Sequence, residues 1–290
     1  MRLLSGIGLV SVVAACFLAP GRASAAVSAG IPAIIPRSTQ YDFTSAINGR
    51  TYRLWVSTPF GAEPGKKYPV VYFIDGNWYF GPATYNETES AGAKEIDHAI
   101  IVGVGYPTDD NNEVSHRRVF ELSTSVLPTD RTKEEHGGAD AFLRVLDEEI
   151  KRFVNAHYAV DPQRQCLYGK SFGGLFVLRQ LLRKPEEFST YIIVSPAVRW
   201  NDHEVLRDEQ AFSQRVKAGD LKLRILFTAA ANENPQLIDD TKKLAERLSP
   251  LNPDKVHVEY TTFADENHVS VSLASIGRGL FFALKKETND

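Results

Sequence analysis

The sequence Gly169-Lys170-Ser171-Phe172-Gly173 places one serine between two glycines, after an apolar strand-like run and before a helix-like stretch. This strand–turn–helix context is the one that a nucleophile elbow requires. The serine of such an elbow has a strained backbone, and the flanking glycines leave room for neighbouring backbone to approach. The same pattern also arises by chance in glycine-containing chains. The flanking strand and helix nevertheless favour Ser171 as a nucleophile.

A serine hydroxyl is a weak nucleophile and needs a base, which in this arrangement is a histidine after the last strand. His268 follows the strand-like run 255–263 and precedes a helical stretch. The alternative interpretation is a surface or helix-capping histidine. His136 precedes Ser171, which is the wrong side for the base, although it could contact a substrate. We therefore predict His268 as the base.

The third member of such a site is a carboxylate that holds the histidine in the correct tautomer. It should follow the strand that ends near Phe227, and Glu233 lies there. We predict Glu233, while three other carboxylates remain competitors: Asp239, Asp240 and Asp265.

Backbone N–H groups should stabilise the oxyanion that forms during attack on an ester. The N–H of Phe172 is one expected donor, because it lies at the start of the helix that follows the serine. The second should come from the turn after the strand-like run 69–75, where we predict the N–H of Asn77. Gly76 and Trp78 are the neighbouring alternatives.

The remaining pattern indicates an α/β fold. Asn48-Gly49 separates two strand-like runs and favours a tight type I′ hairpin. The runs 69–75 and 99–106 are almost continuously apolar, as expected for parallel strands covered on both faces. Further strands are expected over 163–169, 190–197, 221–230 and 255–263, and helices over 138–158, 172–182, 204–217, 235–248 and 269–286. This alternation predicts a doubly wound, mostly parallel sheet with an N-terminal antiparallel hairpin.

Residues 1–25 resemble an export signal, with a short positive start, an apolar run and Ala23-Ser24-Ala25 before the cleavage point. Periplasmic or secreted localisation follows from this interpretation. The alternative is a lipoprotein anchored through Cys16, and without that lipid we expect no stable membrane insertion. Residues 26–290 are expected to form a single domain. Its polar, irregular segment 107–137 is long for a connection and predicts a lid or binding loop.

Charge and cysteine content narrow the functional classes. Removing residues 1–25 takes away Arg2 and Arg22 and no acid, which changes the formal net charge from −3 to −5. A mildly acidic chain without a basic run is a poor candidate for nucleic-acid binding. Cys166 is then the only cysteine and is expected to be a buried apolar residue. No Cys/His cluster has zinc-site spacing, so we expect neither a metal nor another cofactor.

Two longer stretches resemble the putative esterase family of α/β-hydrolases. YPVVYFIDGNWYF (68–80) resembles its strand and oxyanion loop, and residues 137–200 are similar to its helix–strand–elbow–helix–strand core. The family groups feruloyl esterases, S-formylglutathione hydrolases, mycolyltransferases and siderophore esterases. GVGYP followed by an arginine-bearing loop resembles the enterobactin and salmochelin esterase branch. The resemblance implies an α/β-hydrolase fold with Ser171 and His268 in catalysis and Asn77 and Phe172 as oxyanion donors, and it does not decide the acid.

Two departures from the family pattern concern the substrate. Lys170 stands where the family commonly has histidine, and Arg199 is added after the next strand. With Arg117 and Arg118, these residues could meet an anionic substrate, although each could equally be a solvated surface charge. Aromatic residues near the expected site could stack on an aryl group or simply pack in the core: Trp78, Tyr79, Phe80 and Trp200.

The sequence therefore predicts an exported serine esterase that acts on a small-molecule ester, such as a siderophore or aryl ester, through an acyl-enzyme. An acyltransferase that uses the same serine and histidine is an alternative. A hydrolase-fold protein that binds a ligand without turnover is another.

Overall fold

The computed structural model describes residues 30–125, 136–219 and 221–286. The chain divides into a unit of Met1–Ile34 and a compact unit of Ile35–Asp290, and the second unit contains the whole sheet. The predicted signal peptide (1–25), the alternative lipidation site Cys16 and the middle of the predicted lid (126–135) lie outside the described residues.

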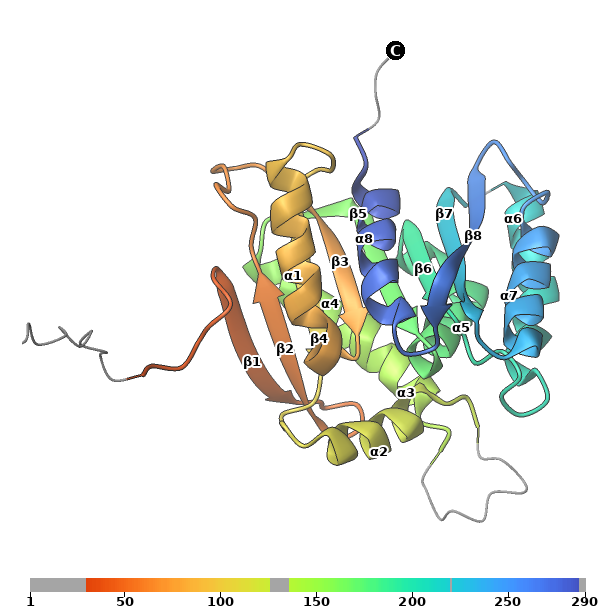
Figure 1. The fold of residues 1–290 in the computed structure, drawn as a ribbon, viewed down its shortest axis with the longest axis horizontal. Coiled ribbons are helices and arrows are strands. Elements are labelled where there is room, and N and C mark those ends of the chain that lie inside the picture. The colour runs from red at the N-terminus through yellow and green to blue at the C-terminus, as the bar shows by residue number, and fades with distance from the viewer. Residues whose placement is uncertain (1–29, 126–135, 220, 287–290) are drawn as a thin grey trace, which may run out of the picture. The chain divides into compact units, whose positions relative to one another are not determined.

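Eight strands form one sheet in the order β1-β2-β4-β3-β5-β6-β7-β8 (Figure 1). β2 runs antiparallel to β1 and β4, and every pair from β4 to β8 is parallel. This confirms the predicted doubly wound, mostly parallel sheet with an N-terminal antiparallel hairpin. The strands are β1 (Ser38–Thr44), β2 (Thr51–Ser57), β3 (Tyr68–Ile74), β4 (Ile100–Gly105), β5 (Val160–Lys170), β6 (Thr190–Val194), β7 (Leu223–Asn232) and β8 (Val256–Asn267).

The hairpin turn differs from the prediction. β1 and β2 pair from Ser38 with Ser57 to Thr44 with Thr51, so six residues connect them. A type I′ turn needs two successive residues with positive φ. Here Gly49 has a φ of 71°, and Asn48 is not among the residues with positive φ. The side chain of Asn48 instead accepts a hydrogen bond from the N–H of Arg50 and donates one to the hydroxyl of Tyr52, which favours a wider turn.

Helices cover both faces of the sheet, because alternate strand residues point to opposite sides. In β3, Val71 and Phe73 pack with α1 (Gly76–Gly92) and α8 (Val271–Leu284), which lie on the near face in Figure 1. Tyr72 and Ile74 pack into the larger core on the far face. The elements that pack there are α3 (Ala139–Arg144), the π-helix η1 (Val145–Ile150), α4 (Lys151–His157), α5 (Phe172–Arg183), η3 (Glu204–Asp208), α6 (Glu209–Ala218) and α7 (Pro235–Leu248).

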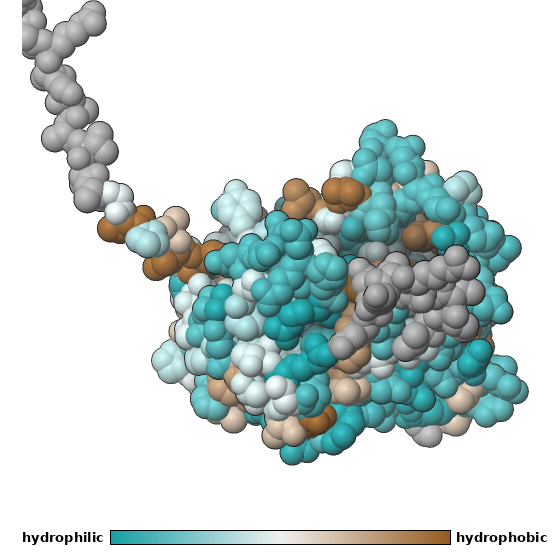
Figure 2. Space-filling model, turned by 90° about the horizontal axis from the view of Figure 1, so that it is seen from below, coloured by the Kyte–Doolittle hydropathy of each residue, from teal (hydrophilic) through white to brown (hydrophobic). Residues whose placement is uncertain are grey.

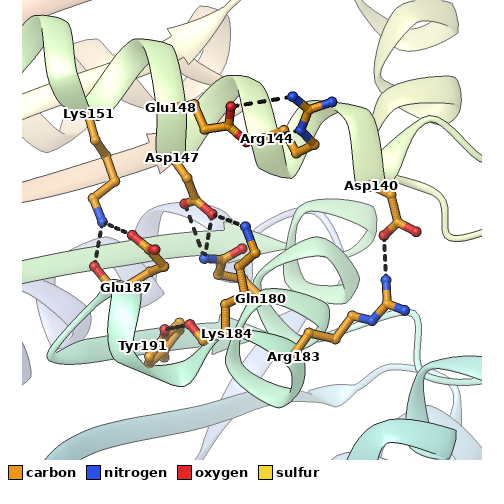
Figure 3. A network of polar contacts seen from close by, with 10 residues as sticks. All are labelled: Asp140, Arg144, Asp147, Glu148, Lys151, Gln180, Arg183, Lys184, Glu187 and Tyr191. Carbon is orange, nitrogen blue, oxygen red and sulfur yellow. Dashed lines mark hydrogen bonds and ion pairs between the residues drawn. The ribbon is translucent and has the colours of Figure 1, made fainter. Parts of the chain in front are cut away.

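Polar contacts tie the continuous stretch α3–η1–α4 to α5 and to the short 3₁₀ helix η2 (Pro185–Glu187) (Figure 3). Asp140 accepts hydrogen bonds from Arg179 at 2.7 Å and Arg183 at 2.9 Å. Lys151 donates at 2.6 Å both to the side chain and to the carbonyl of Glu187. Because α5 begins directly after Ser171, these contacts help to fix the helix that carries the predicted nucleophile.

Two further helices were not predicted as such. α1 follows β3 although it contains Pro82, and α2 (Asn111–Leu122) lies within the segment 107–137 that was expected to be irregular. Asp110 caps α2 by accepting a hydrogen bond from the N–H of Asn112. The predicted lid or binding loop is therefore helical over α2, at the lower edge of the sheet in Figure 1.

Candidate active site

Ser171 lies on a strained turn between β5 and α5. Its φ of 59° and ψ of −116° fall in a region that non-glycine residues rarely adopt. A Cβ atom at Gly169 would lie 2.2 Å from the carbonyl oxygen of Gly173, and one at Gly174 would lie 2.8 Å from that of Val194. At Gly173 the nearest atom to such a Cβ is an Asp75 oxygen at 3.2 Å, so that position is less tight. Close backbone approach therefore requires glycine at 169 and 174.

A continuous chain of hydrogen bonds joins Ser171, His268 and Glu233. The Oγ atom of Ser171 lies 3.1 Å from Nε2 of His268, and Nδ1 of His268 lies 2.6 Å from Oε1 of Glu233. These residues directly follow β5, β8 and β7, so the carboxyl ends of parallel strands bring them together. A carboxylate only accepts hydrogen bonds, so Nδ1 of a neutral His268 must donate. Nε2 is then free to accept the serine proton.

Glu233 is held as an ionised acceptor. Its side chain is 1% exposed, and its Oε2 atom accepts bonds from the N–H of Ala230 at 2.8 Å and the hydroxyl of Ser195 at 2.9 Å. Burial alone would raise the pKa of Glu233, but the hydrogen bonds from His268, Ala230 and Ser195 outweigh it and lower the pKa below its usual range. Glu233 is therefore a carboxylate at neutral pH.

The competing carboxylates lie elsewhere. Asp240 contacts Nε2 of His203 at 3.0 Å, and Asp239 pairs with Lys243 along α7 at 2.7 Å. Asp265 lies exposed within β8. Of the four candidates, Glu233 is the one in contact with His268. Ser195 was not predicted as part of the site. Its position directly after a buried strand, β6, is the signal that could have indicated it.

The two predicted oxyanion donors lie in the first turns of two helices. Phe172 is the first residue of α5 and Asn77 the second residue of α1, and N–H groups in a first helical turn have no acceptor within the helix. The N–H of Trp78 donates to the carbonyl of Asp75 at 2.9 Å, so this alternative donor is engaged. Gly76 packs against the backbone of Gly103, where a Cβ atom would lie only 2.6 Å away.

The side chain of Asn77 fixes the loop around its own N–H. Its Oδ1 accepts from the N–H of Tyr106 at 2.9 Å, and its Nδ2 donates to the carbonyls of Tyr106 and Thr108, both at 3.0 Å. The start of α1 is thereby joined to the loop after β4.

Arg118 and Arg117 are engaged by the protein itself. The guanidinium of Arg118 forms a bidentate ion pair with Asp75 at 2.8 and 2.9 Å, and the two side chains are 12% and 0% exposed. Arg117 donates to the carbonyl of Thr51 at 2.7 Å and lies 4.4 Å from the ring centre of Tyr106. The structure thus places both guanidiniums in contacts that fix α2 against the sheet.

Lys170 and Arg199 remain without a carboxylate partner in the described part of the chain. Lys170 is 8% exposed, and burial together with the nearby charge of Arg118 lowers the pKa of its ammonium, against the opposite effect of Glu233 and Asp75. Arg199 is exposed. Lys170 is therefore a buried cation, and Arg199 is a cation at the surface that lines the pocket beside Ser171.

A pocket of about 300 Å³ opens beside Ser171 and His268. Trp200 forms one wall, with its ring edge-on to Phe172 at 5.0 Å and its Nε1 donating to the carbonyl of Ser125. Trp78 lies outside this pocket and donates from its Nε1 to Asn111, while Tyr79 and Phe80 are buried in the core. The other lining residues are Ala197, Arg199, Asn201 and Leu237, of which only Arg199 was predicted.

Two larger cavities, of about 740 and 580 Å³, lie at the opposite edge of the sheet, where β3, β5 and β7 begin. Neither contains any of the predicted catalytic residues. Size alone would therefore select the wrong end of the molecule, and the hydrogen-bonded chain decides the assignment of the candidate site.

Comparison with known proteins identifies the family. The family model of the putative esterases matches residues 45–272. The chain belongs to the putative esterase family. It is a carboxylic ester hydrolase with the α/β-hydrolase fold, in the siderophore esterase-like branch.

Several relatives illustrate this membership. The ferri-bacillibactin esterase BesA of Bacillus subtilis is 34% identical over 264 residues, which cover 86% of this chain and 90% of that protein. The siderophore triacetylfusarinine C esterase of Aspergillus fumigatus is 28% identical over 277 residues, covering 86% and 94%. The crystal structure of the BES protein from Bacillus cereus superposes with a TM-score of 0.83 at 28% identity and covers 89% of this chain and all of that one.

Within residues 30–125, 136–219 and 221–286, no cluster of three or more His, Cys, Asp and Glu side chains could hold a metal ion. No helix in those same ranges has the length and apolar character needed to cross a membrane. Cys166 is a buried free cysteine.

Proposed function

We propose that this esterase cleaves siderophore-type aryl esters through a covalent acyl-enzyme on Ser171. The observation that carries the proposal is the hydrogen-bonded chain from Ser171 through His268 to Glu233 at the mouth of the 300 Å³ pocket. In this arrangement each group has a partner of the right chemistry: a hydroxyl, a base that accepts its proton, and a carboxylate that fixes the base.

The reaction then proceeds in two steps. Nε2 of His268 takes the Ser171 proton while Oγ forms a bond to the ester carbonyl carbon. The tetrahedral intermediate collapses, and the same histidine gives its proton to the departing alcohol oxygen. Water, activated by His268, next attacks the acyl-enzyme and releases the acid and the free serine. The 43% exposure of the His268 side chain is consistent with access of this water.

The N–H groups of Asn77 and Phe172 are the proposed oxyanion donors. Both lie at helix N-termini, where the helix dipole favours negative charge. A single such donor contributes about 3 kcal/mol to the transition state. The Arg118–Asp75 pair and the hydrogen bonds of the Asn77 side chain hold the turn before α1, and Arg118 also contacts the carbonyl of Lys170 before α5. These contacts keep both donors in place before substrate binds.

The substrate class is inferred from the pocket walls and the relatives. Trp200 offers an aromatic ring and Arg199 a cation at the pocket, and Lys170 is a buried residue directly before the nucleophile in the chain. An acyl group with an aromatic ring and a negative charge suits this combination. The relatives' names, which specify ferri-bacillibactin and triacetylfusarinine C esterases, support a siderophore ester.

The test compares wild type with Ser171→Ala and His268→Ala. A fluorophosphonate probe should label wild type and not Ser171→Ala, and a panel of catecholate, aryl and alkyl esters should be hydrolysed with preference for anionic aryl esters. Acyl-enzyme of the expected mass should appear in wild type after rapid quenching and should be absent from His268→Ala, which lacks the base that acylation needs. Labelling of Ser171→Ala, or equal rates across the panel, would contradict the mechanism or the substrate class respectively. Added alcohols test acyl transfer, which should remain minor relative to hydrolysis.

Export is proposed from residues 1–25 alone. Mass spectrometry of the protein recovered from its native compartment should show Ala26 as the first residue. A lipid-modified Cys16 at the N-terminus would instead support the anchored form and would reject cleavage after Ala25.

A further inference from the structure

Two large apolar side chains lie exposed directly after the predicted base. Val269 is 77% exposed and Leu273 is 65% exposed, although most large apolar residues of the described chain are buried. Viewed from the carboxyl end of the sheet, the surface is mainly hydrophilic, with small separate hydrophobic patches (Figure 2). A single exposed apolar residue is common on protein surfaces and needs no explanation. Two such residues close together beside the candidate site indicate a candidate contact surface.

Val269 and Leu273 form one patch on a fixed support. Val269 lies in the turn before α8, and Leu273 is the third residue of this helix. The N–H of Leu273 donates to the carbonyl of Ser270 at 3.3 Å, so the chain from Val269 to Leu273 turns as a helix does and places these two residues, four apart, on one side. The N–H of Ser272 donates to the carbonyl of Val269 at 3.3 Å. α8 is also packed closely on α1, because a Cβ atom at Gly277 would lie 3.3 Å from Asn86. The patch is thus presented by a helix that its neighbour holds in position.

The pocket at the serine does not include this patch. Apart from Ser171 and His268, all its lining residues come from the segment after β6 and from Leu237 of α7. Its 300 Å³ lies at the lower end of the range for ligand pockets, which suits one aryl acyl group. A siderophore surrounds its ferric ion with several chelating arms and is larger than one such group. Part of that substrate must then lie outside the pocket.

The chemistry of the proposed reaction indicates where this part lies. His268 must deliver its proton to the oxygen of the departing alcohol, so the alcohol leaves on the His268 side of the ester bond. The acyl group occupies the pocket beside Ser171. The alcohol portion therefore extends past His268, toward the residues that follow it in the chain.

We propose that Val269 and Leu273 form a leaving-group subsite, which binds the apolar part of the alcohol portion of the ester. This inference rests on the proposed function. The two side chains contact substrate only until the first step is complete, because the alcohol then departs. They act on acylation and have no part in the hydrolysis of the acyl-enzyme.

The test uses two esters that share one aryl acyl group and differ in the alcohol, one being methyl and the other a bulky apolar alcohol. For the bulky ester, Val269→Ser/Leu273→Ser should lower kcat/KM about tenfold or more, in the range that a lost apolar contact gives. The methyl ester should change less than twofold. Where hydrolysis of the shared acyl-enzyme limits turnover, kcat should be the same for both esters and both proteins.

Phe60→Ser is the matched control. Phe60 is also 65% exposed, but it lines the 740 Å³ cavity at the opposite edge of the sheet, so its loss should affect neither ester. Equal effects of the double variant on both esters, or none on either, would overturn the subsite. Failure of the proposed function is distinguishable, because it would appear in wild type as absent labelling of Ser171 or absent hydrolysis of both esters.

Discussion

At the scale of single residues, Glu233 fixes the orientation of His268 because its ionised carboxylate can only accept a hydrogen bond from Nδ1. Two donors, the N–H of Ala230 and the hydroxyl of Ser195, hold one carboxylate oxygen, and this leaves the other for Nδ1 of His268. The tautomer of the histidine is therefore determined by groups that lie on β6 and β7 and never reach the substrate.

Glu233→Gln should lower kcat by about 10³–10⁴-fold without loss of folding. The glutamine carbonyl will take the place of Oε2, where two donors already point, and its NH₂ will face Nδ1 of His268. Nδ1 must then accept, so the ring proton moves to Nε2 and the base cannot take the Ser171 proton. Steady-state kinetics with a chromogenic aryl ester measure the effect. Asp239→Asn serves as the control. A comparable loss of kcat in that variant would contradict the assignment of Glu233 as the acid.

Gly169→Ala should destabilise the protein by about 1–3 kcal/mol, as overpacking does, and reduce labelling of Ser171. The added methyl would lie 2.2 Å from the carbonyl oxygen of Gly173, so the elbow must move. Chemical denaturation and fluorophosphonate labelling report the two effects. Gly92→Ala has no atom within 4 Å of the new methyl and should be neutral. Unchanged stability in Gly169→Ala would show that the turn is looser than its geometry indicates.

Chain order and strand ends were sufficient to predict which residues meet at this site. Ser171, Glu233 and His268 each follow a recognisable strand, and parallel strands bring such positions to one edge. The partners of Arg118 and Glu233 were not predictable in the same way. The sequence does not distinguish a buried arginine from an exposed one. Arg118 reaches Asp75 only because α2 packs beside the turn after β3. Ser195 reaches Glu233 only because β6 and β7 are paired so that their carboxyl ends lie together.

At the scale of elements, the Arg118–Asp75 pair joins α2 to the turn between β3 and α1. Asp75 has a left-handed φ of 61° and precedes Asn77, and the guanidinium of Arg118 also lies 3.5 Å from the carbonyl of Lys170. One buried arginine therefore contacts both turns that carry the proposed oxyanion donors. Removing only one partner of a buried ion pair strongly destabilises the folded state, because the other charge stays buried without a partner.

Arg118→Ala should lower the free energy of unfolding by about 3–5 kcal/mol, because Asp75 is left as an uncompensated buried charge. Asp75→Asn/Arg118→Ala should lose less than the sum of Asp75→Asn and Arg118→Ala, since neither charge then remains. Urea denaturation of all four proteins forms the double-mutant cycle. Additive losses would mean that the two side chains do not interact, contrary to their 2.8 Å contact. Arg118→Lys should not restore wild-type stability, because lysine lacks the bidentate geometry.

Asp140→Asn tests the contact between α3 and α5. Hydrogen bonds from Arg179, with further attraction from Arg183, keep the pKa of Asp140 below its usual 3.8 despite partial burial. A depressed carboxyl pKa stabilises the folded state above the unfolded value and loses this effect as the pH falls through the folded value. At pH 7 the variant should be less stable by about 1 kcal/mol, a modest value because Asp140 is half-exposed.

Thermal unfolding at pH 7 and pH 3 measures this difference. It should shrink at pH 3, as the wild-type carboxylate becomes protonated. Glu148→Gln removes the more exposed pair with Arg144 in the same network and should leave stability nearly unchanged at both pH values (Figure 3). A difference in Asp140→Asn that persisted undiminished at pH 3 would mean that charge is not its cause.

The sequence pattern predicted the strands more completely than the helices. Buried parallel strands are continuous apolar runs, but α1 is covered by α8 on one side and by the sheet on another, so its buried residues form no single stripe. It also contains Pro82, which normally argues against a helix interior. The connection between the parallel strands β3 and β4 was the available indication, because such a crossover is usually helical.

At the scale of the whole molecule, the complete sheet and its two cores belong to the unit Ile35–Asp290. A protein that begins at Ile35 should therefore keep its melting temperature within about 2 °C and its kcat/KM within twofold. Differential scanning calorimetry and ester hydrolysis would check this. A marked loss of either property would show that residues 1–34 contribute to the fold or to the site.

The positions of the cavities have a practical consequence for inhibitor discovery. Two cavities larger than the candidate site lie at the amino ends of the strands, bordered by Lys66, Lys94, Arg164 and Arg224, whereas turnover is proposed for the smaller pocket at the carboxyl ends. Compounds selected for affinity alone can bind in these larger cavities without inhibiting ester hydrolysis. Screens against this esterase should therefore be scored by product formation or by competition for the reactive serine.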